Sequence, residues 1–161
     1  LMLKIFKKKM MMQIANFGNM EIRKAKKKDL KEIAGIFREE TSKKPYNKKW
    51  TEKETLKIIK KFFKENEISV VIIERKIAGF AISYIKPNKK SAFIDELWFR
   101  ARYQRKGLGK SLMKFLEDNY RKKGINELGL IVNQKAGALQ FYNKLGYKKE
   151  YAFFQMSKKI K

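Results

Sequence analysis

The feature that most constrains the fold is a basic, glycine-containing segment between a predicted strand and a predicted helix. Residues 92–99 have the pattern of a strand, and the sequence YQRKGLGKSL at residues 103–112 leads into an amphipathic helix. A strand, a glycine-containing loop and a helix N-terminus bring several backbone N–H groups and the positive end of a helix dipole to one point. This arrangement suits a phosphate or pyrophosphate. We therefore expect the chain to use a phosphate-bearing cofactor or substrate.

The chain has 161 residues, of which none is cysteine or histidine. This length is typical of one domain that can bury a proper core. The absence of both residue types excludes disulfides, thiolate nucleophiles, imidazole bases and the usual zinc ligands. We expect no metal site, and catalysis must rely on carboxylates, tyrosine, serine, threonine or lysine.

The formal net charge is +25, from 41 basic and 16 acidic residues. Seven of the 41 are arginine, which leaves 34 lysines spread over every segment. Surfaces that read phosphates tend to use clustered arginine. A compositional bias is therefore favoured over a nucleic-acid partner, which stays open as the alternative. No apolar run approaches the ~18 residues that a transmembrane helix needs, and the first residues lack the order of a secretory signal. We expect a cytoplasmic protein.

Residues 1–19 differ in composition from the rest, with lysines at 7–9 and methionines at 10–12. We expect them to be an extension that precedes a domain at residues 20–161. A basic amphipathic anchor on a membrane or another protein is the alternative.

The regular patterns begin at Met20 and predict an α/β (α+β) fold. Strands are expected near residues 21–25, 68–74, 77–86, 91–99, 127–132 and 147–156. Helices are expected after the capping boxes at residues 29–32 and 51–54, and over residues 108–123 and 136–145. Hairpins beside one β-α-β unit give a mixed, mostly antiparallel, twisted sheet. We expect six to seven strands flanked by about four helices.

Two segments of this chain carry a family resemblance. Residues 104–109 (QRKGLG) match the pattern Gln/Arg-x-x-Gly-x-Gly/Ala, and residues 141–147 (FYNKLGY) match Phe/Leu-Tyr-x-Lys-x-Gly-Phe/Tyr. With the strand between them and the order of elements around them, they resemble the GNAT superfamily of acyl-CoA N-acyltransferases. The resemblance extends from Met20 to about Met156. It implies a GNAT-like sheet with two splayed central strands and acetyl-CoA (coenzyme A) as the cofactor.

The resemblance also implies where the cofactor binds. Its pantetheine arm would pair with the backbone of the strand before the loop, and its pyrophosphate would lie against the loop. Gly107 and Gly109 allow a close approach of the backbone. The expected cofactor-binding residues are Leu97, Trp98, Phe99, Arg105, Lys106, Gly107, Leu108, Gly109 and Lys110. Relatives usually have an asparagine where this chain has Lys135, so either Asn133 takes that role or Lys135 reaches the phosphates.

Transfer of an acetyl group to an amine needs a base for the amine, a donor for the oxyanion and an acid for the leaving thiolate. The resemblance assigns the acid to the tyrosine of the second motif, Tyr142. A phenol has an ordinary pKa of about 10 and is protonated at neutral pH, which agrees with this role. Asp95 and Glu96 are the candidate bases, and they face opposite sides of a regular strand. Glu96 is preferred, although a β-bulge would change which of them faces the cleft. A backbone N–H of residues 97–99 is the expected oxyanion donor.

The resemblance implies that the acceptor amine meets the loop between the first two helices, which is lysine-rich in this chain (residues 41–50). Lysines there repel polycations and suit an acidic peptide N-terminus, so a protein or peptide α-amine is favoured. A small amine or a polyamine is the alternative, because a local pair of carboxylates can outweigh global charge. A basic, non-catalytic RNA- or ribosome-associated protein of the same fold is the second alternative. The chain is expected to be a monomer or a homodimer.

Overall fold

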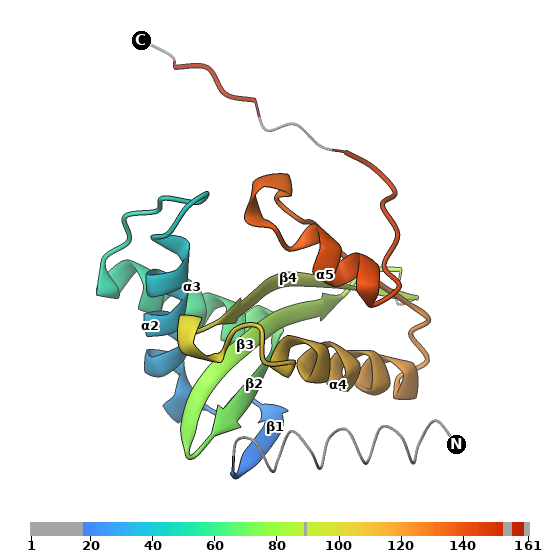
Figure 1. Cartoon of the computed structure of the whole chain (residues 1–161), viewed down its shortest axis with the longest axis horizontal. Helices are drawn as coiled ribbons and strands as arrows, with labels where there is room; N and C mark the ends of the chain where they lie inside the picture. The colour runs from blue at the N-terminus through green and yellow to red at the C-terminus, as the bar shows by residue number, and fades with distance from the viewer. Residues whose placement is uncertain (1–17, 89, 153–155, 160–161) are drawn as a thin grey trace. The chain divides into compact units, whose positions relative to one another are not determined.

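The computed structural model of the chain describes residues 18–88, 90–152 and 156–159 (Figure 1). It divides into two units, the first ending at Ile131 and the second beginning at Val132. The first unit holds a five-stranded sheet with the strand order β1-β2-β3-β4-β5. These strands are β1 (Met20–Lys24), β2 (Glu67–Ile73), β3 (Lys76–Ile85), β4 (Ser91–Phe99) and β5 (Glu127–Leu130). Neighbouring strands are antiparallel except β4 and β5, which are parallel.

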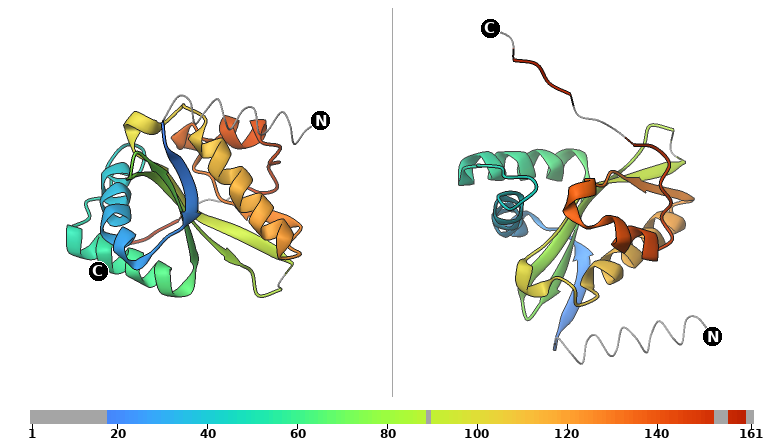
Figure 2. Two further views of the ribbon diagram at one scale, coloured as in Figure 1. Left: turned by 90° about the horizontal axis from the view of Figure 1, so that it is seen from below. Right: turned by 45° about the horizontal axis from the view of Figure 1, so that its top comes forward.

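Helices cover both faces of this sheet within the first unit. Helices α2 (Leu30–Thr41) and α3 (Glu52–Glu65) lie on one face, and α4 (Leu108–Lys122) lies on the other (Figure 2). The main core joins the predicted apolar face of α2 (Leu30, Ile33, Ala34 and Phe37) to β-strand residues such as Val70, Phe80 and Ile82. On the opposite face, the buried Tyr120 hydroxyl of α4 donates to Ser83 Oγ of β3 at 2.7 Å. The alternating side-chain directions of strands produce these two cores.

The two predicted capping boxes have different outcomes. At α3 the box is confirmed, because the Glu54 N–H donates to Thr51 Oγ1 at 3.2 Å and the Thr51 N–H donates to Glu54 Oε2 at 2.8 Å. At α2 it is wrong, although the helix begins where expected. The buried Asp29 carboxylate instead accepts from the Arg23 guanidinium at 2.7 Å and from the Lys26 N–H at 2.6 Å. A short 3-10 turn, η1 (Lys27–Asp29), therefore precedes the helix.

The sheet has fewer strands than the expected six to seven. The strand predicted at residues 147–156 is absent from the described residues of that segment, and residues 153–155 lie outside them. The second unit contains η3 (Gln134–Ala136) and α5 (Leu139–Lys144). Gly137, at φ +68°, separates them and breaks the single helix predicted over residues 136–145. The four α-helices of the described chain match the expected number. Of the expected extension, only residues 18 and 19 are described.

No helix in the described part of the chain is long and apolar enough to cross a membrane.

A close contact between β3 and β4 gives a test of the core. Gly79 lies opposite Phe99, and a Cβ added at Gly79 would be 2.3 Å from Phe99 Cδ1. We expect Gly79→Ala to lower the free energy of unfolding by about 1–3 kcal/mol, because the buried ring must move. Urea denaturation measures this change. Gly35→Ala is the matched control, since nothing lies within 4 Å of its added Cβ and alanine favours the helix. Equal stability of Gly79→Ala and the wild type would contradict the prediction.

Candidate active site

The predicted phosphate-binding loop is a tight turn before α4. Arg105 and Gly107 have positive φ angles of +58° and +82°, and Gly107 is the N-cap of α4. The first intrahelical bond of α4 runs from the Ser111 N–H to the Gly107 carbonyl at 3.2 Å. The N–H groups that precede Ser111 in the first turn therefore have no acceptor within the helix. They point toward the N-terminal end of α4, which Arg105 and Lys106 directly precede in the chain. A phosphate group bound there would meet N–H donors next to basic residues.

The register of β4 shows which backbone groups face its far edge. The Arg100 N–H donates to the Ala78 carbonyl at 2.9 Å, and Gly79 lies opposite Phe99. Gly79 and Phe99 are therefore a non-hydrogen-bonded pair of the antiparallel ladder. The N–H and carbonyl groups of Phe99 consequently point away from β3.

The same alternation assigns the other two residues of the expected pantetheine strand. The backbone groups of Leu97 point away from β3, like those of Phe99, whereas those of Trp98 belong to the β3 ladder. On the far edge, β5 pairs with β4 only from Ser91 to Ile94 and ends at Leu130. Within the described first unit, β4 thus runs on to Phe99 without a neighbouring strand on that side. An added strand could pair with Leu97 and Phe99 but not with Trp98.

A β-bulge is present on β4, at the two candidate bases. Ile82 lies opposite Glu96 and Ser83 lies opposite Ile94, so Asp95 is the extra residue. The Asp95 side chain is largely exposed, and partial burial raises the pKa of its carboxyl. Glu96 is half-buried and lies on the sheet face that carries Trp98. The two candidate bases therefore have different environments.

Glu96 has the most perturbed carboxyl of this region. Burial raises its pKa to about 7, the negative charge of Asp95 adds to this rise, and a hydrogen bond from the Trp98 indole Nε1 opposes it. In the part of the chain that the structure describes, Trp98 is the one side chain that donates to this carboxylate. A carboxyl group with a pKa near 7 is suited to accept a proton at physiological pH.

Sequence reasoning missed Tyr46, which lies in the loop between α2 and α3. Its ring contacts the Trp98 ring edge-to-face, with 5.1 Å between centroids, and Phe37 contacts Trp98 from α2 at 6.3 Å. Burial and the nearby charge of Glu96 raise the pKa of the Tyr46 phenol. We name the half-buried group of Glu96, Trp98 and Tyr46 the aromatic–carboxylate cluster. The loop at residues 41–50 was expected to meet the acceptor amine, but nothing in the sequence indicated that its tyrosine contacts a residue of β4.

Gln104, the first residue of the loop motif, interacts with the protein. Its Nε2 donates to the Phe99 carbonyl at 2.8 Å and to Glu40 Oε2 at 3.1 Å. The Phe99 carbonyl is therefore occupied, and Leu97 supplies both an N–H and a carbonyl to the free edge of β4. The amide of Gln104 fixes the path of the chain between that edge and the Gly107 turn.

The other expected site residues lie in the second unit. Tyr142 of α5 contacts the rings of Phe141 and Tyr147, with centroids 5.0 and 5.9 Å away. The Asn133 side chain accepts from the Lys135 N–H at 2.9 Å and caps η3, and both residues are exposed. The capping bond gives Asn133 a local structural role, and the ammonium of Lys135 remains accessible to solvent.

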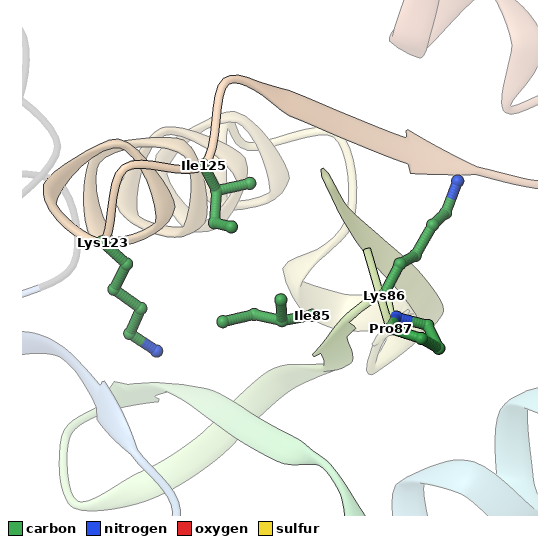
Figure 3. Close-up of a pocket in the computed structure, with 5 residues that line it drawn as sticks. All are labelled: Ile85, Lys86, Pro87, Lys123 and Ile125. Atoms are coloured by element: carbon green, nitrogen blue, oxygen red, sulfur yellow. The ribbon is translucent and has the colours of Figure 1, made fainter. Parts of the chain in front are cut away.

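A shallow pocket of the first unit lies elsewhere. Figure 3 shows Ile85 and Ile125 between Lys123 on one side and Lys86 and Pro87 on the other. Lys123 follows the C-terminal end of α4, whereas Gly107 precedes its N-terminal end. Fifteen helical residues span about 22 Å, so this pocket is separate from the predicted phosphate-binding turn.

Solved structures share this fold. The structure of "a possible acetyltransferase" from Clostridium difficile 630 is 18% identical in sequence to this chain. Its TM-score is 0.71, and the match covers 88% of this chain and 99% of that chain. An aminoglycoside acetyltransferase from an uncultured soil metagenomic sample, in complex with trehalose, is 23% identical, with a TM-score of 0.68 over 91% and 99%. A ribosomal-protein-alanine N-acetyltransferase from Brucella melitensis biovar Abortus 2308 is 15% identical, with a TM-score of 0.69 over 88% and 100%.

At these identities the similarity shows the fold alone. None of the curated proteins compared with this chain matches it in sequence. The family model described as the acetyltransferase (GNAT) family matches residues 30–147, which include both motifs and most of the chain. The protein therefore belongs to the GNAT family of acetyltransferases.

Proposed function

We propose that the protein transfers an acetyl group from acetyl-CoA to the α-amine of a protein or peptide. The observation that carries this proposal is the aromatic–carboxylate cluster beside β4. It contains a carboxyl group whose pKa is about 7, on the strand whose free edge leads to the Gly107 turn. The acceptor amine needs a base that can take up a proton near neutral pH. Acetyl-CoA needs a strand edge for its amides and a turn for its phosphates.

The residues of the turn and of β4 fit acetyl-CoA. The first N–H groups of α4 and the side chains of Arg105, Lys106 and Lys110 would hold its phosphates. Leu97 and Phe99 offer backbone groups to its amides in the manner of an added strand. Lys135 is a further candidate for the phosphates, with Asn133 as the alternative contact. When bound, acetyl-CoA supplies the activated acyl group.

The chain's own groups supply the proton transfers and charge stabilisation. The Glu96 carboxylate accepts a proton from the acceptor ammonium, directly or through a water, which leaves a neutral amine able to attack. The Leu97 N–H is placed at the free edge and is the proposed donor to the oxyanion. The family resemblance assigns protonation of the departing thiolate to the Tyr142 phenol. In this direct transfer both substrates are bound at once.

The loop that carries Tyr46 supports an acceptor with negative charge near its amine. Lys44, Lys48 and Lys49 flank Tyr46 within the loop, and all three are exposed. No salt bridge involves them in the described structure. These charges would attract carboxylates that follow an α-amine and would repel polycations at low salt.

The proposal is tested by release of free thiol from acetyl-CoA. We expect faster release with a peptide that begins Ala-Asp-Glu than with one that begins Ala-Lys-Lys, and Tyr142→Phe should slow release by at least about tenfold because a phenyl ring cannot protonate the thiolate. Tyr151→Phe is the matched control, since Tyr151 is an exposed tyrosine of the same unit. Wild-type turnover by Tyr142→Phe would remove Tyr142 from this role. Absence of thiol release with every amine would reject the proposed activity.

Two other functions are separated by the same assay. Faster turnover of spermidine than of the acidic peptide would favour the small-amine or polyamine alternative, which the neighbouring carboxylates of Asp95 and Glu96 support. A net charge of +25 supports a nucleic-acid partner. Binding of that kind should fall steeply with salt and should survive Tyr142→Phe.

A further inference from the structure

Glu40 is a buried carboxylate that the sequence motifs do not include. It lies in the last turn of α2, and only 5% of its surface is exposed. A buried charge is costly unless charged or polar partners surround it. Gln104 Nε2 donates to Glu40 Oε2 at 3.1 Å, and Lys43 Nζ donates to Oε1 at 2.6 Å. Each oxygen of Glu40 is therefore held by a different loop.

The contact with Gln104 connects Glu40 to the turn that would bind the acetyl donor. Gln104 lies immediately before Arg105, which opens the turn with a positive φ angle of +58°. The same Nε2 atom that contacts Glu40 also donates to the Phe99 carbonyl at 2.8 Å. A shift of Gln104 would therefore move the start of the phosphate-binding turn relative to β4.

The contact with Lys43 connects Glu40 to the loop that would meet the acceptor amine. The carbonyl of Lys43 accepts hydrogen bonds from the N–H groups of Tyr46 and Asn47, both at 3.0 Å. Tyr46 in turn contacts Trp98 and is part of the aromatic–carboxylate cluster. Lys43 therefore joins the Glu40 carboxylate to the backbone that carries Tyr46.

We propose that Glu40 is a positioning residue that couples the donor-binding turn to the acceptor loop. The inference rests on the proposed function, because it assigns acetyl-CoA to the turn and the amine to the aromatic–carboxylate cluster. Occupancy of the turn favours the position of Gln104 that holds Glu40, and this favours the positions of Lys43 and Tyr46. The coupling is reciprocal, since each ligand must change the affinity for the other by the same factor.

Hydrogen exchange tests this coupling without knowledge of the natural acceptor. Saturating coenzyme A should slow exchange at the Tyr46 and Asn47 amides of the wild type by about fivefold or more, in the range of ordinary allosteric couplings. In Glu40→Gln, which keeps the shape but removes the charge, the slowing should be lost while coenzyme A still binds. Glu52→Gln is the matched control, because its carboxylate is exposed and pairs with Lys31 and Arg38 instead. It should retain the slowing.

The outcomes separate this inference from the proposed function. If calorimetry detects no heat with coenzyme A, both fail. If coenzyme A binds but exchange at residues 46 and 47 is unchanged in the wild type, or is slowed equally in Glu40→Gln, the coupling role alone is wrong. Should Glu40→Gln fail to fold, Lys43→Met breaks the acceptor-side contact and leaves Gln104 in place. That variant should bind coenzyme A and lose the slowing, and retained slowing would likewise overturn the inference.

Discussion

Glu96→Gln is expected to lower kcat/KM by about 10²–10⁴-fold, the usual contribution of a general base. The substitution keeps the size of the side chain and an oxygen that can accept from the Trp98 indole, but it removes the group that takes the proton from the amine. KM for acetyl-CoA should change little, because the proposed donor contacts are backbone groups at the free edge of β4 and at the turn, whereas Glu96 contributes a side chain on a face of the sheet. Steady-state thiol release with the acidic peptide measures both parameters.

The pH dependence identifies the same group independently. The pKa of Glu96 is raised to about 7, mainly by burial. A base must be deprotonated to act, so the wild-type kcat/KM should rise as the pH increases toward 7 and should level off above it. In Glu96→Gln this rise should disappear from what activity remains. A wild-type profile that is flat between pH 6 and 8, or an unchanged profile in the variant, would rule out Glu96 as the base.

The stability of this variant is its internal control. Because the folded state raises the pKa of Glu96, the folded protein binds a proton more tightly than the unfolded chain, and ionisation above pH 7 opposes folding. Glu96→Gln should therefore melt at a higher temperature than the wild type at pH 8, so lost activity cannot be attributed to unfolding. Asp95→Asn is the matched variant on the bulge. It should retain most activity, since the Asp95 carboxyl is largely exposed.

Local patterns predicted the elements whose causes are local. The β2–β3 hairpin, the extent of β4 and the Thr51–Glu54 capping box all follow from residues close together in the sequence. The failures involve partners that are distant or that compete. The Asp29 capping box failed because Arg23, on the preceding strand, binds the same carboxylate. The strand at residues 147–156 was predicted from β-forming residues, but such propensity depends on a neighbouring strand to pair with.

The site follows the same division. The glycines of the turn and the order of the motifs could be identified from the sequence, because the left-handed backbone at Gly107 depends on that residue alone. The choice between Asp95 and Glu96 could not be made from the sequence, because the bulge that separates them arises from pairing with β3. The contacts of Tyr46 with Trp98 and of Gln104 with Glu40 join residues more than fifty positions apart, and no pattern in a single sequence reports them.

Gly107→Val should weaken coenzyme A binding by at least about 100-fold. Gly107 has a φ of +82°, which β-branched residues avoid, and the strain of about 1–3 kcal/mol is relieved if the turn changes shape. A changed turn misdirects the N–H groups at the start of α4. Each hydrogen bond to a charged group is worth about 1.5–3 kcal/mol, so the loss of two such bonds accounts for this factor. Isothermal titration with coenzyme A measures the affinity.

Gly124→Val separates this effect from general strain. Gly124 also has a positive φ, +77°, but it follows the other end of α4 and nothing lies within 4 Å of its added Cβ. The two variants should lose similar stability, whereas only Gly107→Val should lose coenzyme A. Asparagine tolerates the left-handed conformation, so Gly107→Asn should fold well and bind coenzyme A with intermediate affinity. Equal affinities of the Gly107 and Gly124 valine variants would mean that the backbone of the turn does not bind the cofactor's phosphates.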